Sequence, residues 1–326
     1  MKKSGPIVVG AALALALAGG LAVAQSGYPD KPIRILVGFS AGVAPDVTSR
    51  LFGDKWNQTW AKGVAVENVT GAGGNLAVAQ VAKSPADGYT LAMGGNASLV
   101  INPNLMDRLG YDPLKDFAYI TQVFIVPNLV VVPPDVPAKT IPELIALMKS
   151  KPDYFIAGHA GVGTSQHLGG ELFMAMTGVK FQQVPYRGTT QILPDLLGGR
   201  LNLFFGNISN VLPLVREGKL RALAAMAPAR PIALPDVPTL AEAGLTGFDT
   251  TVWFGLMAPA GTPQPIIDKL YDETARVLAQ NEMRKRLQDL GMEIGTNTPA
   301  EFASMIKFEI LQWAKLIKDA GIKVSE

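Results

Sequence analysis

Both histidines of this chain lie in one glycine-rich stretch, GHAGVGTSQHLGG, which spans residues 158–170. A histidine near neutral pH serves as a general base or a metal ligand, so this stretch is the first candidate for chemistry. Gly158 and Gly163 are also spaced as in a phosphate-binding loop. The lysine that such a loop places between its second glycine and its Ser or Thr is missing, so we expect no nucleotide here.

Catalysis and metal binding are poorly supported by the same residues. His159 and His167 are eight positions apart, with only Glu171 as a close carboxylate, which is a weak ligand set for a metal ion. Residues 158–170 contain no Gly-x-Ser-x-Gly motif, so this stretch is not a nucleophile elbow. We therefore expect no catalytic residue, no metal and no cofactor. An exported hydrolase whose catalytic residues meet only in space is the alternative.

The same stretch offers a glycine-rich turn that leads into a helix, with Thr164 or Ser165 at its cap. The free N–H groups and the positive end of the helix dipole suit a carboxylate without any lysine. A second loop has this design, because residues 33–39 read as a strand and a helix begins near Asp46. Two such loops in different domains would hold one anion from both sides. The alternative is a pair of tight turns in which Ser and Thr merely cap the helices.

The elements that must position these loops alternate between short apolar runs and helical patterns. The apolar runs are residues 33–39, 90–93, 129–132, 201–205 and 220–225. Such alternation predicts parallel sheets flanked by helices. Residues 123–132 and 251–259 resemble connections between two globules. We therefore predict one domain formed by residues 25–125 and 254–326, with residues 126–253 inserted as a second domain.

Capping boxes predict where three helices begin: Thr140 with Glu143, Thr239 with Glu242, and Thr298 with Glu301. The last of these helices carries a core stripe of Phe302, Ile306, Ile310, Trp313 and Ile317. One further helix is expected from Thr262 to about Leu290. A glycine cluster at residues 71–74 opens another helix, and we interpret it as a tight connection rather than a site.

Residues 1–24 read as a signal peptide that is cleaved before Gln25. Lys2 and Lys3 precede an apolar segment, and Ala22 and Ala24 fit the cleavage pattern; a membrane anchor is the alternative. Removing this segment takes away two lysines and no acid, which leaves equal numbers of basic and acidic residues. A neutral chain argues against a nucleic-acid partner. The absence of cysteine excludes disulfides and thiolate chemistry.

Motifs over essentially the whole chain carry a family resemblance. They lie at residues 28–33, 71–75, 85–89, 101–103, 163–168, 184–188, 195–199 and 253–263. With these motifs the chain resembles the Bug-type substrate-binding proteins of tripartite tricarboxylate transporters. The resemblance implies an α/β, two-domain periplasmic binding protein fold of type II, in which the ligand cleft lies between domains joined by two crossing strands.

The resemblance also implies a function in the periplasm. Such receptors capture a small carboxylated ligand and deliver it to the membrane subunits of a tripartite tricarboxylate-type transporter. We accordingly expect a monomer that binds a di- or tricarboxylate or an aromatic carboxylate. A receptor that reports its ligand to a membrane sensor is the alternative.

The resemblance assigns ligand contacts to three groups of residues. The first loop supplies Phe39, Ser40, Gly42 and Val43. The second loop supplies His159, Ala160, Gly163, Thr164 and Ser165. The remaining wall is expected to contain Asn96, Ala97, Ser98, Tyr186, Gly206 and Asn207.

Several positions depart from the family pattern or stay open. Gly206 stands where many relatives have Asp, which removes a partner for an ammonium group and disfavours amino acids as ligands. His159 replaces a small residue and is either a donor to a distal carboxylate or a structural histidine. Arg187 is either a cation for an acidic ligand or part of a surface or interdomain salt bridge. Asp46 is expected to serve the first helical turn rather than the ligand.

Overall fold

The computed structural model describes residues 27–319 and 321, with the exception of residue 107. The predicted signal peptide, residues 1–24, lies outside the described residues. Within the described part of the chain, no helix combines the length and the apolar composition that a membrane crossing requires.

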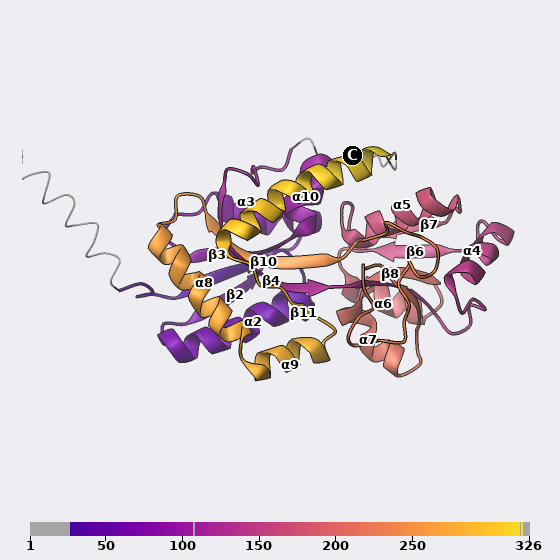
Figure 1. The fold of residues 1–326 in the computed structure, drawn as a ribbon, viewed down its shortest axis with the longest axis horizontal. Coiled ribbons are helices and arrows are strands. Elements are labelled where there is room, and N and C mark those ends of the chain that lie inside the picture. Colours follow the sequence, from indigo (N-terminus) through magenta and orange to yellow (C-terminus); the bar gives the residue numbers. More distant parts are fainter. Residues whose placement is uncertain (1–26, 107, 320, 322–326) are drawn as a thin grey trace, which may run out of the picture.

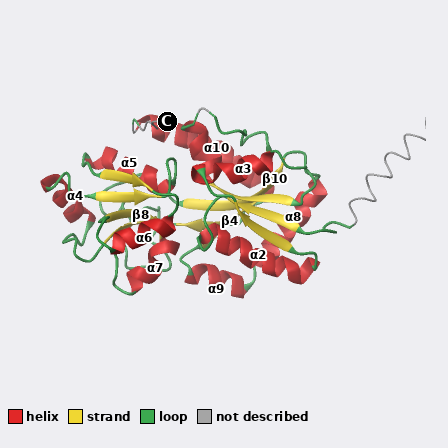
Figure 2. Ribbon diagram, turned by 180° about the vertical axis from the view of Figure 1, so that it is seen from behind, coloured by secondary structure: helices red, strands yellow, loops and turns green. Residues whose placement is uncertain are grey.

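Two β-sheets lie beside each other, and each is covered by helices on both faces (Figures 1 and 2). We call the half that contains the six-stranded sheet lobe 1. Its strand order is β11 (Glu293–Ile294), β4 (Phe117–Val126), β10 (Val252–Pro259), β3 (Thr90–Gly95), β1 (Ile33–Val37) and β2 (Val64–Asn68). Lobe 2 contains the five-stranded sheet. Its order is β7 (Gln182–Pro185), β6 (Ile156–His159), β8 (Leu203–Asn207), β5 (Asn128–Val132) and β9 (Arg221–Ala225).

The chain passes between the sheets at two adjacent places. Strand β4 ends at Val126, and after Pro127 the chain continues in lobe 2 as β5. It returns at Thr251 and enters the first sheet as β10, where Val252 pairs with Val126. The predicted limits of the inserted domain, residues 126 and 253, lie next to these two crossings. The exact limits stay a prediction.

The prediction of parallel sheets is wrong for the strands next to these crossings. Strand β10 runs antiparallel to both β3 and β4, and β5 runs antiparallel to β8 and β9. Strands β5 and β10 are antiparallel to their neighbours because each enters its sheet from the other lobe and therefore runs away from the cleft. Strands β1, β2 and β3, and likewise β6, β7 and β8, are parallel as expected.

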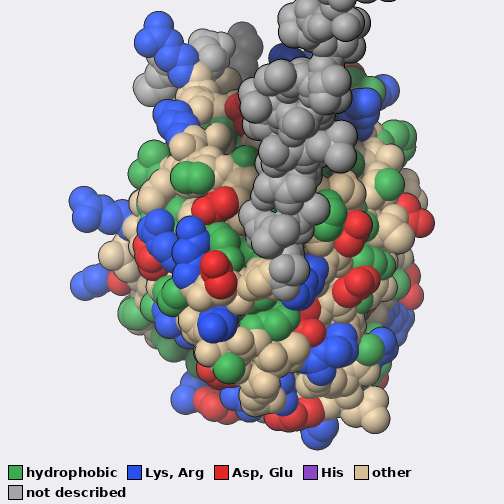
Figure 3. Space-filling view, turned by 90° about the vertical axis from the view of Figure 1, so that its left-hand side faces the viewer, with side chains coloured by type: hydrophobic (Ala, Val, Ile, Leu, Met, Phe, Trp, Pro, Cys, Tyr) green, Lys and Arg blue, Asp and Glu red, His purple; other side chains and the backbone are tan. Residues whose placement is uncertain are grey.

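Helices fill the faces of both sheets. Lobe 1 carries α2 (Ala44–Trp60), α3 (Asn75–Ala82), α8 (Gln264–Leu278), α9 (Asn281–Asp289) and α10 (Pro299–Asp319). Lobe 2 carries α4 (Ile141–Ser150), α5 (Ser165–Thr177), α6 (Thr189–Leu197) and α7 (Ile208–Arg216). On the end of lobe 1 remote from lobe 2, basic and acidic side chains are interspersed (Figure 3).

Two helix predictions need correction. The single helix expected from Thr262 to Leu290 is two helices, α8 and α9, because the backbone of Gln280 is extended between them. The capping box of Thr239 and Glu242 forms both of its hydrogen bonds, at 2.7 and 3.1 Å, yet no helix follows. Gly244 adopts a left-handed φ of +96° two residues later, which ends the segment as a turn.

Helix α10 packs its predicted apolar stripe against the sheet of lobe 1. Phe302, Ile306, Trp313 and Ile317 are buried, while Ile310 is partly buried. The ring of Phe302 lies directly on the backbone of Gly255 in β10, where an added Cβ would approach the ring within 2.3 Å. The absence of a side chain at residue 255 therefore allows α10 to pack closely against the central strand β10.

We expect Phe302→Ala to lower the free energy of unfolding by about 3–5 kcal/mol, because it removes a fully buried ring from this contact. Phe308→Ala is the matched control, since Phe308 lies on the same helix with a relative exposure of 61%. That control is expected to change stability by less than about 0.5 kcal/mol. Urea unfolding followed by circular dichroism measures both, and equal effects would contradict the packing described.

Candidate functional site

A cavity of about 520 Å³ lies between the lobes, at the carboxyl ends of the parallel strands. The loops that follow β1, β2 and β3 form the wall in lobe 1, and the loops that follow β6, β7 and β8 form the wall in lobe 2. Val126, Val252 and Phe254 of the crossing strands complete it. Ligand sites of α/β proteins lie at this edge of a sheet, because there the loops converge.

Five helices begin in the loops that line the cavity. They are α2 and α3 in lobe 1 and α5, α6 and α7 in lobe 2. The first turn of each helix has N–H groups without an intrahelical acceptor and the positive end of the helix dipole. The described lining residues include no Asp or Glu and a single Lys or Arg, Arg187. The cavity thus favours an anion through its main chain.

The start of α5 is organised by Thr164. Its hydroxyl donates to the carbonyl of Gly161 at 2.7 Å and accepts from the N–H of His167 at 3.4 Å. This cap fixes the turn and leaves the N–H groups of Ser165 and Gln166 in the first helical turn for another acceptor. The second loop therefore has the geometry expected for it.

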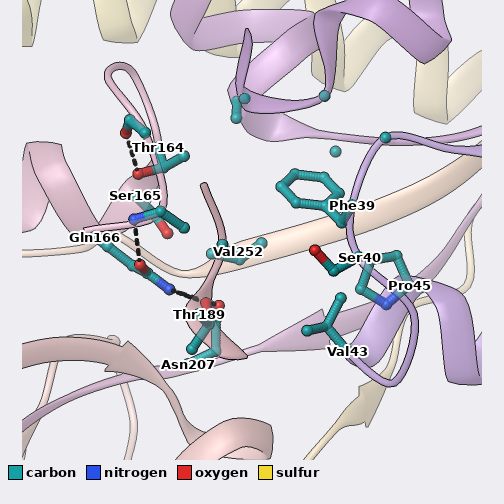
Figure 4. A pocket seen from close by; sticks show the side chains of 18 of the residues that line it. Phe39, Ser40, Val43, Pro45, Thr164, Ser165, Gln166, Thr189, Asn207 and Val252 are labelled. Atoms are coloured by element: carbon teal, nitrogen blue, oxygen red, sulfur yellow. Dashed lines mark hydrogen bonds between the residues drawn. The ribbon is translucent and has the colours of Figure 1, made fainter. Parts of the chain in front are cut away.

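Gln166 joins the starts of three helices in lobe 2. Its Oε1 accepts from the N–H of Ala160 at 2.9 Å, and its Nε2 donates to the hydroxyl of Thr189 at 3.1 Å. Asn207, at the start of α7, lies 3.5 Å from the same nitrogen. Figure 4 shows this group facing Phe39, Ser40 and Val43 of lobe 1 across the cavity. Gln166 and Thr189 were not predicted, although Gln166 lies within the motif at residues 163–168.

Asp46 organises the first loop without lining the cavity. Its carboxylate accepts from the N–H of Gly42 at 2.9 Å, from Arg50 at 3.0 Å and from Asn68 at 2.9 Å. Burial raises the pKa of Asp46, but these donors outweigh it and the pKa is lower than usual. Asp46 therefore stays charged, and it fixes the N–H group of Gly42, which lies outside the cavity lining.

The structure brings ten of the fifteen predicted residues to the cavity. They are Phe39, Ser40, Val43, Asn96, Ala97, Ala160, Thr164, Ser165, Tyr186 and Asn207. It places the other five away from the lining: Gly42, Ser98, His159, Gly163 and Gly206.

His159 is buried behind the second loop, with 3% of its surface exposed. Its Nδ1 accepts from the N–H of Gly161 at 3.3 Å, and its ring centre lies 4.7 Å from that of His167. Burial, followed by the neighbouring His167, lowers the pKa of His159 to about 4. His159 is therefore neutral at neutral pH and supports the second loop from a position outside the cavity lining.

Ser98 and Gly206 point into the protein interior. The Ser98 hydroxyl donates to the carbonyl of Gly95 at 3.1 Å. An added Cβ at Gly206 would lie 2.0 Å from the ring of Phe204, so a side chain there would not enter the cavity in this arrangement. The inference that Gly206 removes a carboxylate from the cavity wall is therefore not supported by its geometry.

The glycine cluster at residues 71–74 needs a correction, because it lines the cavity. Gly71, Gly73 and Gly74 all adopt positive φ values. An added Cβ at Gly38 would lie 2.5 Å from the Cα of Gly74, so the first and third loops touch through their backbones. The signal for this third loop was the run of glycines immediately before a helix start.

The lobes also touch each other beside the cavity. Gly163 of lobe 2 faces Asn102 of lobe 1, and an added Cβ would lie 2.0 Å from the Asn102 Oδ1. Gly188 of lobe 2 faces Ser40 of lobe 1, with a corresponding distance of 3.0 Å to the hydroxyl. The absence of side chains at residues 163 and 188 therefore permits this close approach of the lobes.

Solved structures and curated proteins resemble the chain over most of its length. Rpa4515 of R. palustris, solved with adipate, is 34% identical with a TM-score of 0.87, covering 91% of this chain and 99% of that one. MatC of Rhodopseudomonas palustris, solved with bound malate, is 33% identical with a TM-score of 0.83, covering 89% and 100%. BugT of Bordetella pertussis is 33% identical over 303 residues, which are 93% of each chain.

The likeness to these structures and the two mixed sheets confirm the predicted two-domain periplasmic binding protein fold. Residues 49–322 match the sequence model of a protein family, the tripartite tricarboxylate transporter family receptor. This chain therefore belongs to the tripartite tricarboxylate transporter receptors of the Bug type.

Proposed function

We propose that this protein captures a small organic carboxylate in the cavity between its lobes and delivers it to membrane subunits of a tripartite transporter. The observation that carries the proposal is the convergence of five helix N-termini on a cavity whose described lining contains no carboxylate. Adipate in Rpa4515 and malate in MatC are consistent with this ligand class.

Export and the absence of catalysis are part of the same proposal. A cleaved signal peptide, residues 1–24, would place a monomeric receptor in the periplasm. Neither histidine lines the cavity, so the hydroxyls of Ser40, Thr164 and Ser165 have no histidine base beside them among the described lining residues. Capture needs only closure of two lobes around the ligand, which buries it and supplies its hydrogen bonds.

The test is a ligand screen of the purified mature protein. Native mass spectrometry identifies what co-purifies, and thermal shifts with di-, tri- and aromatic carboxylates are checked by calorimetry. We expect at least one carboxylate to stabilise the protein, whereas the corresponding amides should not. A ligand-free protein that responds to no carboxylate would refute the proposal.

Thr164→Ala is expected to weaken carboxylate binding about fivefold, or about 1 kcal/mol, because it removes the cap that fixes the start of α5. Thr140→Ala is the matched control: its hydroxyl caps α4 in the same lobe at 3.3 Å but lies outside the lining. Isothermal calorimetry of both variants decides the matter. An equal loss of affinity in the control would show that capping stability, rather than the position of α5, governs binding.

Gly163→Ala is expected to lower affinity at least about tenfold by keeping the lobes apart. The new methyl group would meet Asn102, whose amide is fixed by a 2.9 Å hydrogen bond to Asn75. Gly178→Ala is the control, because Gly178 has a similar positive φ of +70° in lobe 2 but nothing within 4 Å. Affinity is measured by calorimetry and lobe separation by small-angle X-ray scattering. If the two variants bind alike, lobe contact at residue 163 plays no part.

A further inference from the structure

Arg187 lies in lobe 2, two residues after the end of β7. It lines the cavity, yet its side chain is exposed, in contrast to the buried Ser165, Gln166 and Thr189. The cavity therefore offers an anion two positions that differ in depth. The inner position consists of helix N-termini, and the outer position is a guanidinium.

The charge of Arg187 is not used elsewhere in the described structure. Its main-chain N–H donates to Gln191 Oε1 at 3.3 Å, and no described carboxylate lies within ion-pair distance of its side chain. The nearest acid along the chain on α6, Asp195, accepts from Tyr186 at 2.7 Å and from Arg200 at 2.9 Å. Asp46 of the facing loop is held by Arg50. The open alternative of a surface salt bridge is therefore disfavoured.

The turn that carries Arg187 faces the first loop of lobe 1. Gly188 lies against the Ser40 hydroxyl, so the turn that carries Arg187 lies where the two lobes meet beside the cavity. Phe39, Val43 and Val252 also line the cavity (Figure 4). Apolar side chains beside two anion-favouring positions suit a molecule with two carboxylates and an apolar spacer.

We propose that Arg187 is the residue that selects dicarboxylates over monocarboxylates of the same chain length, by pairing with the carboxylate at the outer position. The proposal rests on the function proposed above and adds the second half of the ligand to it. The inner carboxylate meets the N-termini of lobe 2, and it is bound equally in both ligand types. Arginine suits the outer position because its fork donates two hydrogen bonds to one carboxylate.

The test compares linear dicarboxylates from succinate to suberate with monocarboxylates of equal chain length. Wild-type protein, Arg187→Gln and Arg187→Lys are titrated by calorimetry with the best-bound dicarboxylate and its matched monocarboxylate. Arg216→Gln is the control, because Arg216 is an exposed arginine of lobe 2 outside the lining.

Arg187→Gln is expected to weaken the dicarboxylate about threefold to tenfold and to leave the monocarboxylate unchanged. Arg187→Lys should lie between, and Arg216→Gln should change neither. Equal losses for both ligand types, or no loss for the dicarboxylate, would overturn the role of Arg187 while leaving carboxylate capture intact. Failure of the wild-type protein to bind any of these acids, or the other carboxylates of the screen, would overturn both proposals together.

Discussion

The structure depends on the direction in which its parallel strands point. In both lobes the carboxyl ends of these strands face the other lobe, so the helices that follow them begin at one shared cavity. Main-chain N–H groups then provide positive potential at a place where the described lining contains no acid and a single cation. A cluster of buried lysines would have to lose its hydration, which costs free energy. Main-chain dipoles carry no full charge and avoid this cost.

Close approach of the backbones is the second requirement, and glycine supplies it. Gly38 and Gly74 bring the first and third loops of lobe 1 into contact, and Gly163 brings the second loop against Asn102. The buried amide network of Asn102 and Asn75 gives this contact a rigid support. Lobe 2 therefore meets the side chains of Asn102 and Ser40 in lobe 1 with two positions, residues 163 and 188, that carry no side chain.

Much of this arrangement could be predicted from local sequence. The turn into α5 was readable because glycines precede a Thr that caps the helix, and the resemblance placed the first loop. The starts of α6 and α7 were missed because Gly188 and Asn207 make no side-chain cap, so no capping motif marks them. His159 was misplaced because alternation along β6 turns its side chain away from the cavity, and an isolated residue type does not reveal this.

The antiparallel strands could not be predicted, because their direction depends on the path between lobes. Strand β10 occupies the middle of the first sheet, between β3 and β4, and every one of its residues is buried. It is made only after all strands of lobe 2, since lobe 2 interrupts lobe 1 in the sequence. During synthesis, lobe 2 can complete its sheet while lobe 1 still lacks its central strand. Lobe 1, which begins first in the sequence, therefore cannot complete its sheet until every strand of lobe 2 has been made.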